Sequence, residues 1–159
     1  MAACDVNSAI ANVKTMLKNL SAWQTICGVS TADAAAERIH EYGVDEEEDT
    51  DTLCPLIILD IESSSLAWQG QHLRGPLVVT CRMELEIPEN KRSTYSTQAV
   101  WFWEQWSAML AGISGGVQGS GQLMLDGIST MVKPGRIDPD TNNGRCEWLA
   151  MLGLEIHLQ

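Results

Sequence analysis

The sequence predicts an α+β fold, a two-layer sandwich in which two or three helices pack against a sheet of about four antiparallel or mixed strands. Apolar residues recur at helical spacing over residues 96–113, whereas they alternate with polar residues over 77–87 and 148–158. The expected order is helix, helix, strand, loop, strand, helix, strand, long loop, strand. That order is typical of helices that cover one face of a sheet.

The clearest helix is expected over Ser96 to Ile113, the segment STQAVWFWEQWSAMLAGI, which carries three of the six tryptophans and the only phenylalanine. At 3.6 residues per turn its apolar stripe consists of Phe102, Trp106, Met109, Leu110 and Ile113, with Ala99 and Trp103 at the edge. Ser96 or Thr97 can cap the helix, and Gly115 with Gly116 can end it. Each buried tryptophan removes about 150–250 Å² from water, so we expect this helix to lie across the core.

Trp101 lies off this stripe, beside Gln105, Ala108 and Gly112. One interpretation is partial burial under a neighbouring loop. The other is an aromatic anchor for a second subunit, because tryptophan is enriched at protein interfaces. The sequence leaves both interpretations open.

Two further helices are expected before the first strand. Asp5 or Asn7 can cap a helix that runs to about Trp23, and its apolar stripe is formed by Ile10, Val13, Leu17 and Leu20. After a break at Gly28, a shorter helix fits residues 31–42, with Thr31 as its cap and Gly43 just past its end. His40 would then be a surface residue of this second helix.

Four strands are expected. The first, residues 56–62 after Pro55, starts as a continuous apolar run, which is typical of a strand covered on both faces at one end. The second, 77–87, is bracketed by Pro76 and Pro88. The third covers 123–132, with a possible bulge at Gly127, and the fourth covers 148–158.

The composition indicates one soluble domain over residues 1–159. Hydrophobic residues make up 45%, yet no run approaches the roughly 18 apolar residues of a membrane helix, and the N-terminus lacks the pattern of a signal peptide. The five cysteines are scattered without a C-x-x-C pair, so we expect free, mostly buried thiols in a reducing compartment. The net charge is −11 and the ten basic residues are dispersed, which argues against a nucleic-acid groove.

No motif of catalysis, cofactor binding or metal binding is present. Asp60 and Glu62 form the best carboxylate pair for acid–base work, but nothing nearby supports it. The segment starting at Asp138 resembles a calcium loop, yet Asn143 stands at the position of the mid-loop glycine and Leu149 at that of the terminal carboxylate. We therefore expect no catalytic, cofactor-binding or metal-binding residues.

Two long polar segments are expected to be loops. Residues 63–75 are rich in Ser, Gly and Gln and carry Trp68 near their tip, and residues 133–145 are rich in turn-forming residues. A third segment, 45–51, holds six carboxylates and is typical of a solvated loop.

This order of elements resembles that of the tail terminator and related tail-completion proteins of long-tailed bacteriophages. In that family an N-terminal helix leads through a variable region to a proline that begins the first strand, and then come a long strand, a helix and two strands linked by a long loop. The corresponding segments here are Ile10–Leu20, Pro55–Glu62, Leu77–Ile87, Ser96–Ile113, Leu123–Val132 and Trp148–Leu158. The resemblance covers nearly the whole chain as a pattern and rests on no diagnostic motif.

The resemblance implies a structural virion protein that is assembled in the host cytoplasm and forms a ring, usually of six subunits. Such a ring caps the head-proximal end of the tail tube, so its partners would be itself, the major tail tube protein and the head–tail connector or head-completion protein. DNA would only pass through, and no membrane or cofactor is implied. The expected interface residues are Trp68, Gln69, His72, Arg74, Trp101, Lys133, Arg136, Asp138 and Asp140.

Alternatives remain at this stage. The chain fits a head-completion or neck protein of the same particle, or a small intracellular enzyme or ligand-binding domain that uses the loop at 133–145. Within a ring, Glu46, Glu47 and Glu48 would either line the DNA channel or lie on an outward, solvated loop.

Overall fold

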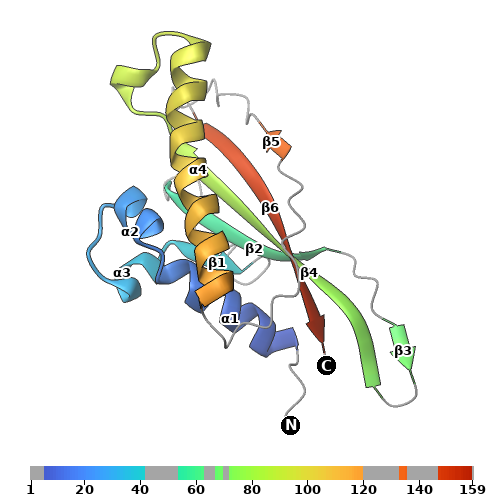
Figure 1. Cartoon of the computed structure of the whole chain (residues 1–159). Coiled ribbons are helices and arrows are strands. Elements are labelled where there is room, and N and C mark those ends of the chain that lie inside the picture. Colours follow the sequence, from blue (N-terminus) through green and yellow to red (C-terminus); the bar gives the residue numbers. More distant parts are fainter. Residues whose placement is uncertain are drawn as a thin grey trace.

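The structure is a computed structural model, and it describes residues 6–41, 54–62, 67–69, 72–119, 133–135 and 147–158. Its helices lie against one face of a mixed sheet, so the predicted α+β class and two-layer arrangement are confirmed (Figure 1). The predicted strand 123–132 lies outside the described residues.

The sheet is built around two long central strands. Its order is β1-β2-β4-β6-β5, and β3 pairs with one end of β4. The strands are β1 (Ile39–Glu41), β2 (Leu56–Glu62), β3 (Ala67–Gln69), β4 (His72–Glu86), β5 (Lys133–Gly135) and β6 (Glu147–Leu158). Among the described strands β1 and β2 pair in parallel, and the other pairings are antiparallel.

The strands β4 and β6 form a continuous ladder from Gly75 opposite Leu158 to Glu86 opposite Glu147. The alternation in the sequence predicts which of their residues face the helices, and the burial confirms it over the described side chains. The buried residues are Leu77, Val79, Cys81, Met83 and Leu85 of β4 and Trp148, Ala150, Leu152 and Leu154 of β6. This face of the sheet supplies one half of the core.

Pro76 does not begin the long strand as the sequence suggested, because β4 starts four residues earlier at His72. Along the other edge of β4, β2 pairs with residues 78–84 and β3 with residues 72–74. On this edge Pro76 therefore lies between the two partners, and on the other edge it is paired with His157 of β6.

Both faces of the strand β2 are covered at its start, and its other end is exposed to solvent. Leu56 and Ile57 are successive residues, so they lie on opposite faces, and both are fully buried. At the other end Ile61 is 39% exposed. The predicted strand, covered on both faces at its start, is confirmed.

The predicted first helix is divided into two helices. The helix α1 (Val6–Lys18) ends before Leu20, which is extended with φ −69° and ψ 123°, and α2 (Ser21–Cys27) then starts in a new direction. The break lets Trp23 reach the core, where its indole Nε1 donates to the carbonyl oxygen of Ala35 at 3.1 Å. Gly28 ends α2 in the left-handed conformation, with φ 67°, as its position in the sequence indicated.

The predicted helix 31–42 is wrong in its second half. Thr31 caps α3 (Ala32–Ala36), and its Oγ1 accepts from Ala34 N–H, but the helix ends after five residues and Ile39–Glu41 form β1. Ile39 is buried and pairs with Ile57 of β2, so burial in the sheet prevails over the weak helical pattern. His40 is therefore a half-buried strand residue and not a surface residue of a helix.

The main helix, α4 (Tyr95–Gly119), is longer than predicted at both ends. Thr94 rather than Ser96 or Thr97 supplies the cap, since Thr97 N–H donates to Thr94 Oγ1 at 3.1 Å. The helix continues past the glycines at 115–116, because a glycine in a helix costs only about 1 kcal/mol and does not by itself end it. Its central residues Phe102, Trp106, Met109 and Ile113 are buried as predicted, and Leu110 is partly buried.

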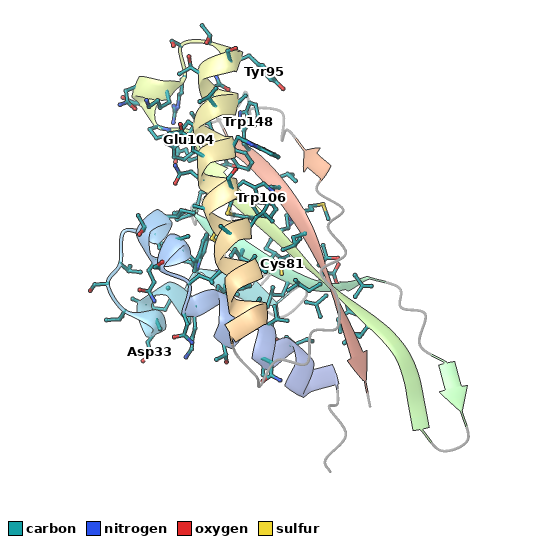
Figure 2. All side chains as sticks on the ribbon, viewed as in Figure 1. Asp33, Cys81, Tyr95, Glu104, Trp106 and Trp148 are labelled. Carbon is teal, nitrogen blue, oxygen red and sulfur yellow. The ribbon has the colours of Figure 1, made fainter. Side chains whose placement is uncertain are left out.

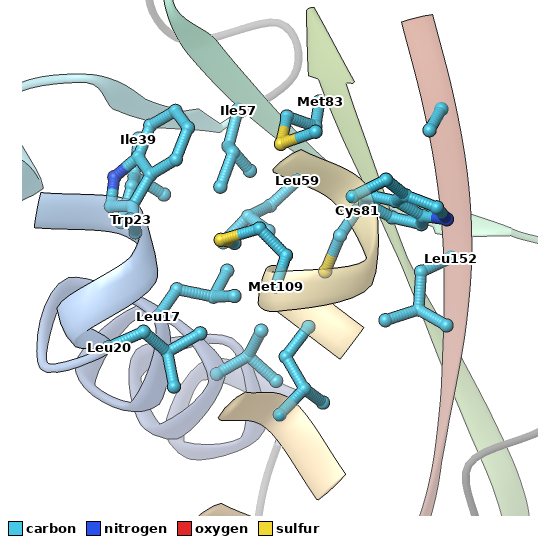
Figure 3. Packing of buried hydrophobic residues seen from close by; sticks show 14 of the residues in the cluster. Leu17, Leu20, Trp23, Ile39, Ile57, Leu59, Cys81, Met83, Met109 and Leu152 are labelled. Carbon is cyan, nitrogen blue, oxygen red and sulfur yellow. The ribbon is translucent and has the colours of Figure 1, made fainter. Parts of the chain in front are cut away.

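The core lies between α1, α2 and α4 on one side and the sheet on the other (Figure 3). Leu17 and Trp23 come from the helical layer, and Ile57 and Cys81 from the sheet, with Met109 of α4 between them. The helices α4 and α2 approach closely at Gly112, where a Cβ atom would lie 3.2 Å from Leu20 Cδ2. The helix α4 therefore packs against Leu20 in the helical layer as well as against the sheet.

Candidate assembly surface

A network of side chains at the top of the molecule fixes the start of α4 (Figure 2). Arg92 follows the short 3-10 helix η2 (Glu89–Lys91), donates from Nε to the carbonyl oxygen of Ile87 at 2.7 Å and pairs with Glu86 at 2.9 Å. Gln98 donates to the carbonyl oxygen of Arg92 and accepts from Trp148 Nε1, each at 3.1 Å. The end of β4, the start of α4 and the start of β6 are thereby joined.

Tyr95 belongs to the same corner although its side chain is largely exposed. Its ring centroid lies 5.2 Å from that of Trp148, and Trp148 lies 5.6 Å from Phe102. Such tilted ring pairs stabilise the packing beyond the area they bury. Tyr95 therefore contributes to the packing of this corner although most of its side chain is exposed.

The outer face of α4 carries large apolar side chains in solvent. Val100 is 61% exposed and Trp103 is 51% exposed, and the exposed Glu104 lies beside them; we call these three residues the α4 strip. Glu104 is the only charged residue from position 95 to 113. Exposed apolar patches rimmed by polar residues mark interaction sites in soluble proteins.

Trp101 lies on the other flank of the helix. It is half-buried, as the first of its two interpretations expected, but it packs against the core cluster and its burial under a loop stays a prediction. It also borders a shallow hollow of about 280 Å³ that is lined by Lys91, Ser96, Thr97, Val100, Trp101 and Glu104. Its predicted role as an interface residue stays a prediction.

The segment predicted as the loop 63–75 contains a two-stranded ribbon. Ala67 pairs with Arg74, Trp68 with Leu73 and Gln69 with His72, before β4 enters the main sheet. We call Ala67–Gln69 and His72–Arg74 the β3–β4 arm; it projects away from the body, at the end of β4 far from the start of α4 (Figure 1). The loop prediction is wrong for these residues because their backbones pair with each other.

The structure describes only some of the remaining predicted site residues. Lys133 is in β5, opposite Met151 of β6, so residues 133–135 are a strand and not the start of a loop. Arg136, Asp138, Asp140, Glu46, Glu47 and Glu48 lie outside the described residues. The structure thus does not bring the nine predicted interface residues into one patch among the residues it describes.

Two cysteine thiols have raised pKa values among the described titratable groups. Burial raises the pKa of the Cys81 thiol to about 12, and burial, opposed by nearby Arg38, raises that of Cys27 to about 11, so both thiols are protonated at neutral pH. Asp60 is exposed near the end of β2, where its carboxylate oxygen accepts from Ile61 N–H at 2.7 Å, and the side chain of Glu62 lies outside the described part of the structure. Within the described ranges no three His, Cys, Asp or Glu side chains are grouped as metal ligands.

A search of the described helices found none that is both long enough and apolar enough to cross a membrane. Comparison with models of known protein families found no match, and comparison with curated proteins found no significant similarity.

The exposed position of Trp103 is the feature that sequence reasoning missed. At 100° per residue Trp103 lies roughly 90° from the centre of the buried stripe, and at that angle the helical wheel does not decide between core and solvent. Val100, nearly opposite the stripe, was a clearer signal, because an apolar β-branched residue there gains nothing from the core.

Proposed function

We propose that this chain is a structural subunit of a long-tailed bacteriophage that forms a ring, of six copies, at the junction of tail tube and head connector. The observation that carries the proposal is the exposed apolar α4 strip on a well-packed subunit, together with the β3–β4 arm, whose strand β3 pairs only with β4 among the described strands. Trp103 and Val100 together give α4 an exposed apolar face that a second subunit would cover. The pattern of elements that resembles the tail terminator family gives the ring its place in a particle.

In this role the ring would contact the major tail tube protein on one side and the head–tail connector or head-completion protein on the other. A subunit that differs along its long axis suits two different partners. In Figure 1 the start of α4 lies at one end of the molecule and the β3–β4 arm at the other.

DNA would pass through the ring without being bound. A lumen lined by Glu46, Glu47 and Glu48 would repel the phosphate backbone over about 8–10 Å at physiological salt, whereas a solvated outer loop would have no such effect. Replacing the three glutamates by lysine should slow DNA ejection from particles if they line the channel. Unchanged ejection would place them on the outer wall.

The ring itself is tested by the mass of the purified full-length chain, measured by native mass spectrometry over a range of concentrations and followed by electron microscopy. We expect a closed species of six subunits. A chain that stays monomeric at all concentrations, also when tail tubes are added, would contradict the proposal. A thermal shift with a small ligand or metal ion in such a monomer would favour a ligand-binding domain instead.

A further inference from the structure

We propose that the hollow beside the start of α4 is a docking site for a partner protein that presents an acidic, an apolar and a basic side chain on one side of an extended segment. The inference rests on the proposed function in one respect, because the partner is then one of the proteins that border the ring. It follows from two unpaired charges in the hollow, from the exposed apolar surface beside them, and from the length of the hollow along α4.

Two side chains of opposite charge line the hollow and do not pair with each other. Lys91 of η2 is half-buried, and Glu104 is exposed on α4 (Figure 2). Within the described part of the chain neither forms an ion pair, so their charged atoms lie more than 4.0 Å apart. By contrast Arg92, the residue next to Lys91, pairs with Glu86 at 2.9 Å. The hollow thus keeps one cation and one anion available for groups of a second molecule.

The hollow also belongs to a larger apolar surface. Val100 lines the hollow and is part of the α4 strip, so the apolar surface continues to Trp103. Half-buried Trp101 borders the hollow from the flank of the helix. Small-molecule sites bury about 70–90% of a ligand, and a shallow hollow of about 280 Å³ leaves more of a ligand in water. A protein surface that covers Trp103 as well as the hollow therefore fits better than a free metabolite.

The length of the hollow indicates an extended segment. Its lining residues on α4 run from Ser96 to Glu104, which at 1.5 Å per residue is about 12 Å. Alternate side chains of an extended segment point to the same side, and its first and fifth residues lie about 13 Å apart. Neighbours one turn apart on a helix are separated by only about 6 Å. An acidic residue opposite Lys91, an apolar one against Val100 and a basic one opposite Glu104 therefore fit alternate positions of an extended segment.

The described segments of a second copy do not supply these three groups. Of the large apolar side chains exposed in the described part of the chain, Ile61 alone lies outside this corner. Its neighbours in the sequence are Asp60 and Glu62, so this segment brings two acidic residues and no basic one to face Glu104. Charge complementarity therefore favours a partner of different sequence over a second copy in this hollow.

The first test uses the capped synthetic peptide Gly-Asp-Ser-Leu-Ser-Lys-Gly and the isotope-labelled full-length chain. The indole N–H signal of Trp101 should shift as peptide is added, with a dissociation constant of about 1 mM. Lys91→Gln and Glu104→Gln should each weaken binding about twofold to fivefold, as expected for one exposed ion pair. Val100→Ser should weaken it about fivefold to tenfold, because less apolar surface is buried.

The matched control for the first test is Lys14→Gln, which removes a half-buried lysine of α1 that also has no ion pair among the described residues. It should leave the affinity unchanged, and circular dichroism should show that all four variants are folded. An unshifted Trp101 signal at several times this peptide concentration would overturn the proposal, and so would equal affinities of the four variants.

A charge exchange tests the pairing at Lys91 directly. Lys91→Glu should lose affinity for this peptide and gain affinity for Gly-Lys-Ser-Leu-Ser-Lys-Gly, because a cation of the peptide then meets the new carboxylate. If Lys91→Glu still preferred the first peptide as the wild-type chain does, the acidic group would not lie at Lys91, and the proposal would be overturned.

The outcomes separate this inference from the proposed function. Rings of six subunits that do not bind the peptide retain the proposed function and contradict the docking site. A monomer that binds the peptide with the expected losses retains the site and contradicts the ring. If the Lys91, Val100 and Glu104 variants instead prevented ring formation, a second copy would cover the hollow, and the proposal of a different partner would be overturned.

Discussion

Trp106 and Trp103 lie three residues apart on the same helix, and their surroundings differ completely. Trp106 is 2% exposed against the sheet, whereas Trp103 is 51% exposed on the outer face of α4. Both residues are tryptophans of the same helix, so the side of the helix on which each lies decides how much it contributes to the stability of the fold. The inner face of α4 contributes to the core, and the outer face exposes Val100 and Trp103 to solvent.

The buried indoles differ in a second respect. Trp23 Nε1 donates to the Ala35 carbonyl and Trp148 Nε1 to Gln98, but Trp106 Nε1 has no acceptor among the described residues. A buried donor without a partner costs about 1–3 kcal/mol. Trp106 is therefore held by its apolar area and not by its N–H group.

The largest expected effect is that of Trp106→Ala. Removing the whole indole from the core should lower the free energy of unfolding by about 3–5 kcal/mol, since it leaves a cavity between α4 and the sheet. Urea denaturation of the monomeric subunit measures this change. A loss of less than about 1 kcal/mol would mean that the inner face of α4 is not the core.

The thiol of Cys81, on the helix-covered face of β4, gives the next effect. Because burial raises its pKa from 9.0 to about 12, the unfolded chain releases this proton first as pH rises. The stabilisation is complete below pH 9 and should fall by about 1.4 kcal/mol per pH unit between about pH 9 and 12. Unfolding measured over that range in Cys81→Ala should lack this part of the slope; an identical slope would contradict the prediction.

A third comparison removes one N–H group from each of two buried indoles. Trp23→Phe should cost about 1–3 kcal/mol more than its loss of volume, because it leaves the Ala35 carbonyl without its donor. Trp106→Phe loses similar volume but removes an unsatisfied donor, so its net cost should be smaller. Urea denaturation of both variants measures the two losses in the free energy of unfolding. If Trp106→Phe cost as much as Trp23→Phe or more, Trp106 Nε1 would have a hydrogen-bond acceptor in solution.

The smallest effect on stability is expected for Trp103→Ala. An exposed side chain contributes little to folding, so the free energy of unfolding should change by less than about 0.5 kcal/mol. Thermal melting at a concentration where the chain is monomeric measures this. A large loss would place Trp103 in the core of the subunit and remove the contrast between the two faces of α4.

The sequence was sufficient where burial imposes a regular period. The alternation of Leu77 to Leu85 and the stripe from Phe102 to Ile113 depend only on one face meeting the core, and both are observed. The short strand Ile39–Glu41 could not be found in this way, because its pairing with β2 joins residues distant in sequence. The β3–β4 arm was missed for a related reason, since Gly and Gln residues in a ribbon resemble those of a loop.

The candidate surface was predictable only in part. Trp68 and Arg74 were expected at an interface because they lie in a polar segment, and they do belong to a projecting element. Trp103 was placed at the edge of the core stripe, although half of its surface is exposed. Whether a residue at an intermediate angle on a helix is buried depends on the width of the sheet beneath the helix. The local sequence pattern does not show that width.

The continuity of β4 has a mechanical consequence. A single strand runs from His72 in the arm to Glu86, and Glu86 is joined through Arg92 to the first turns of α4. A force applied to the arm would therefore act along β4 and load the hydrogen bonds between β4 and β6 in shear. It would reach α4 through the contacts of Glu86, Arg92 and Gln98.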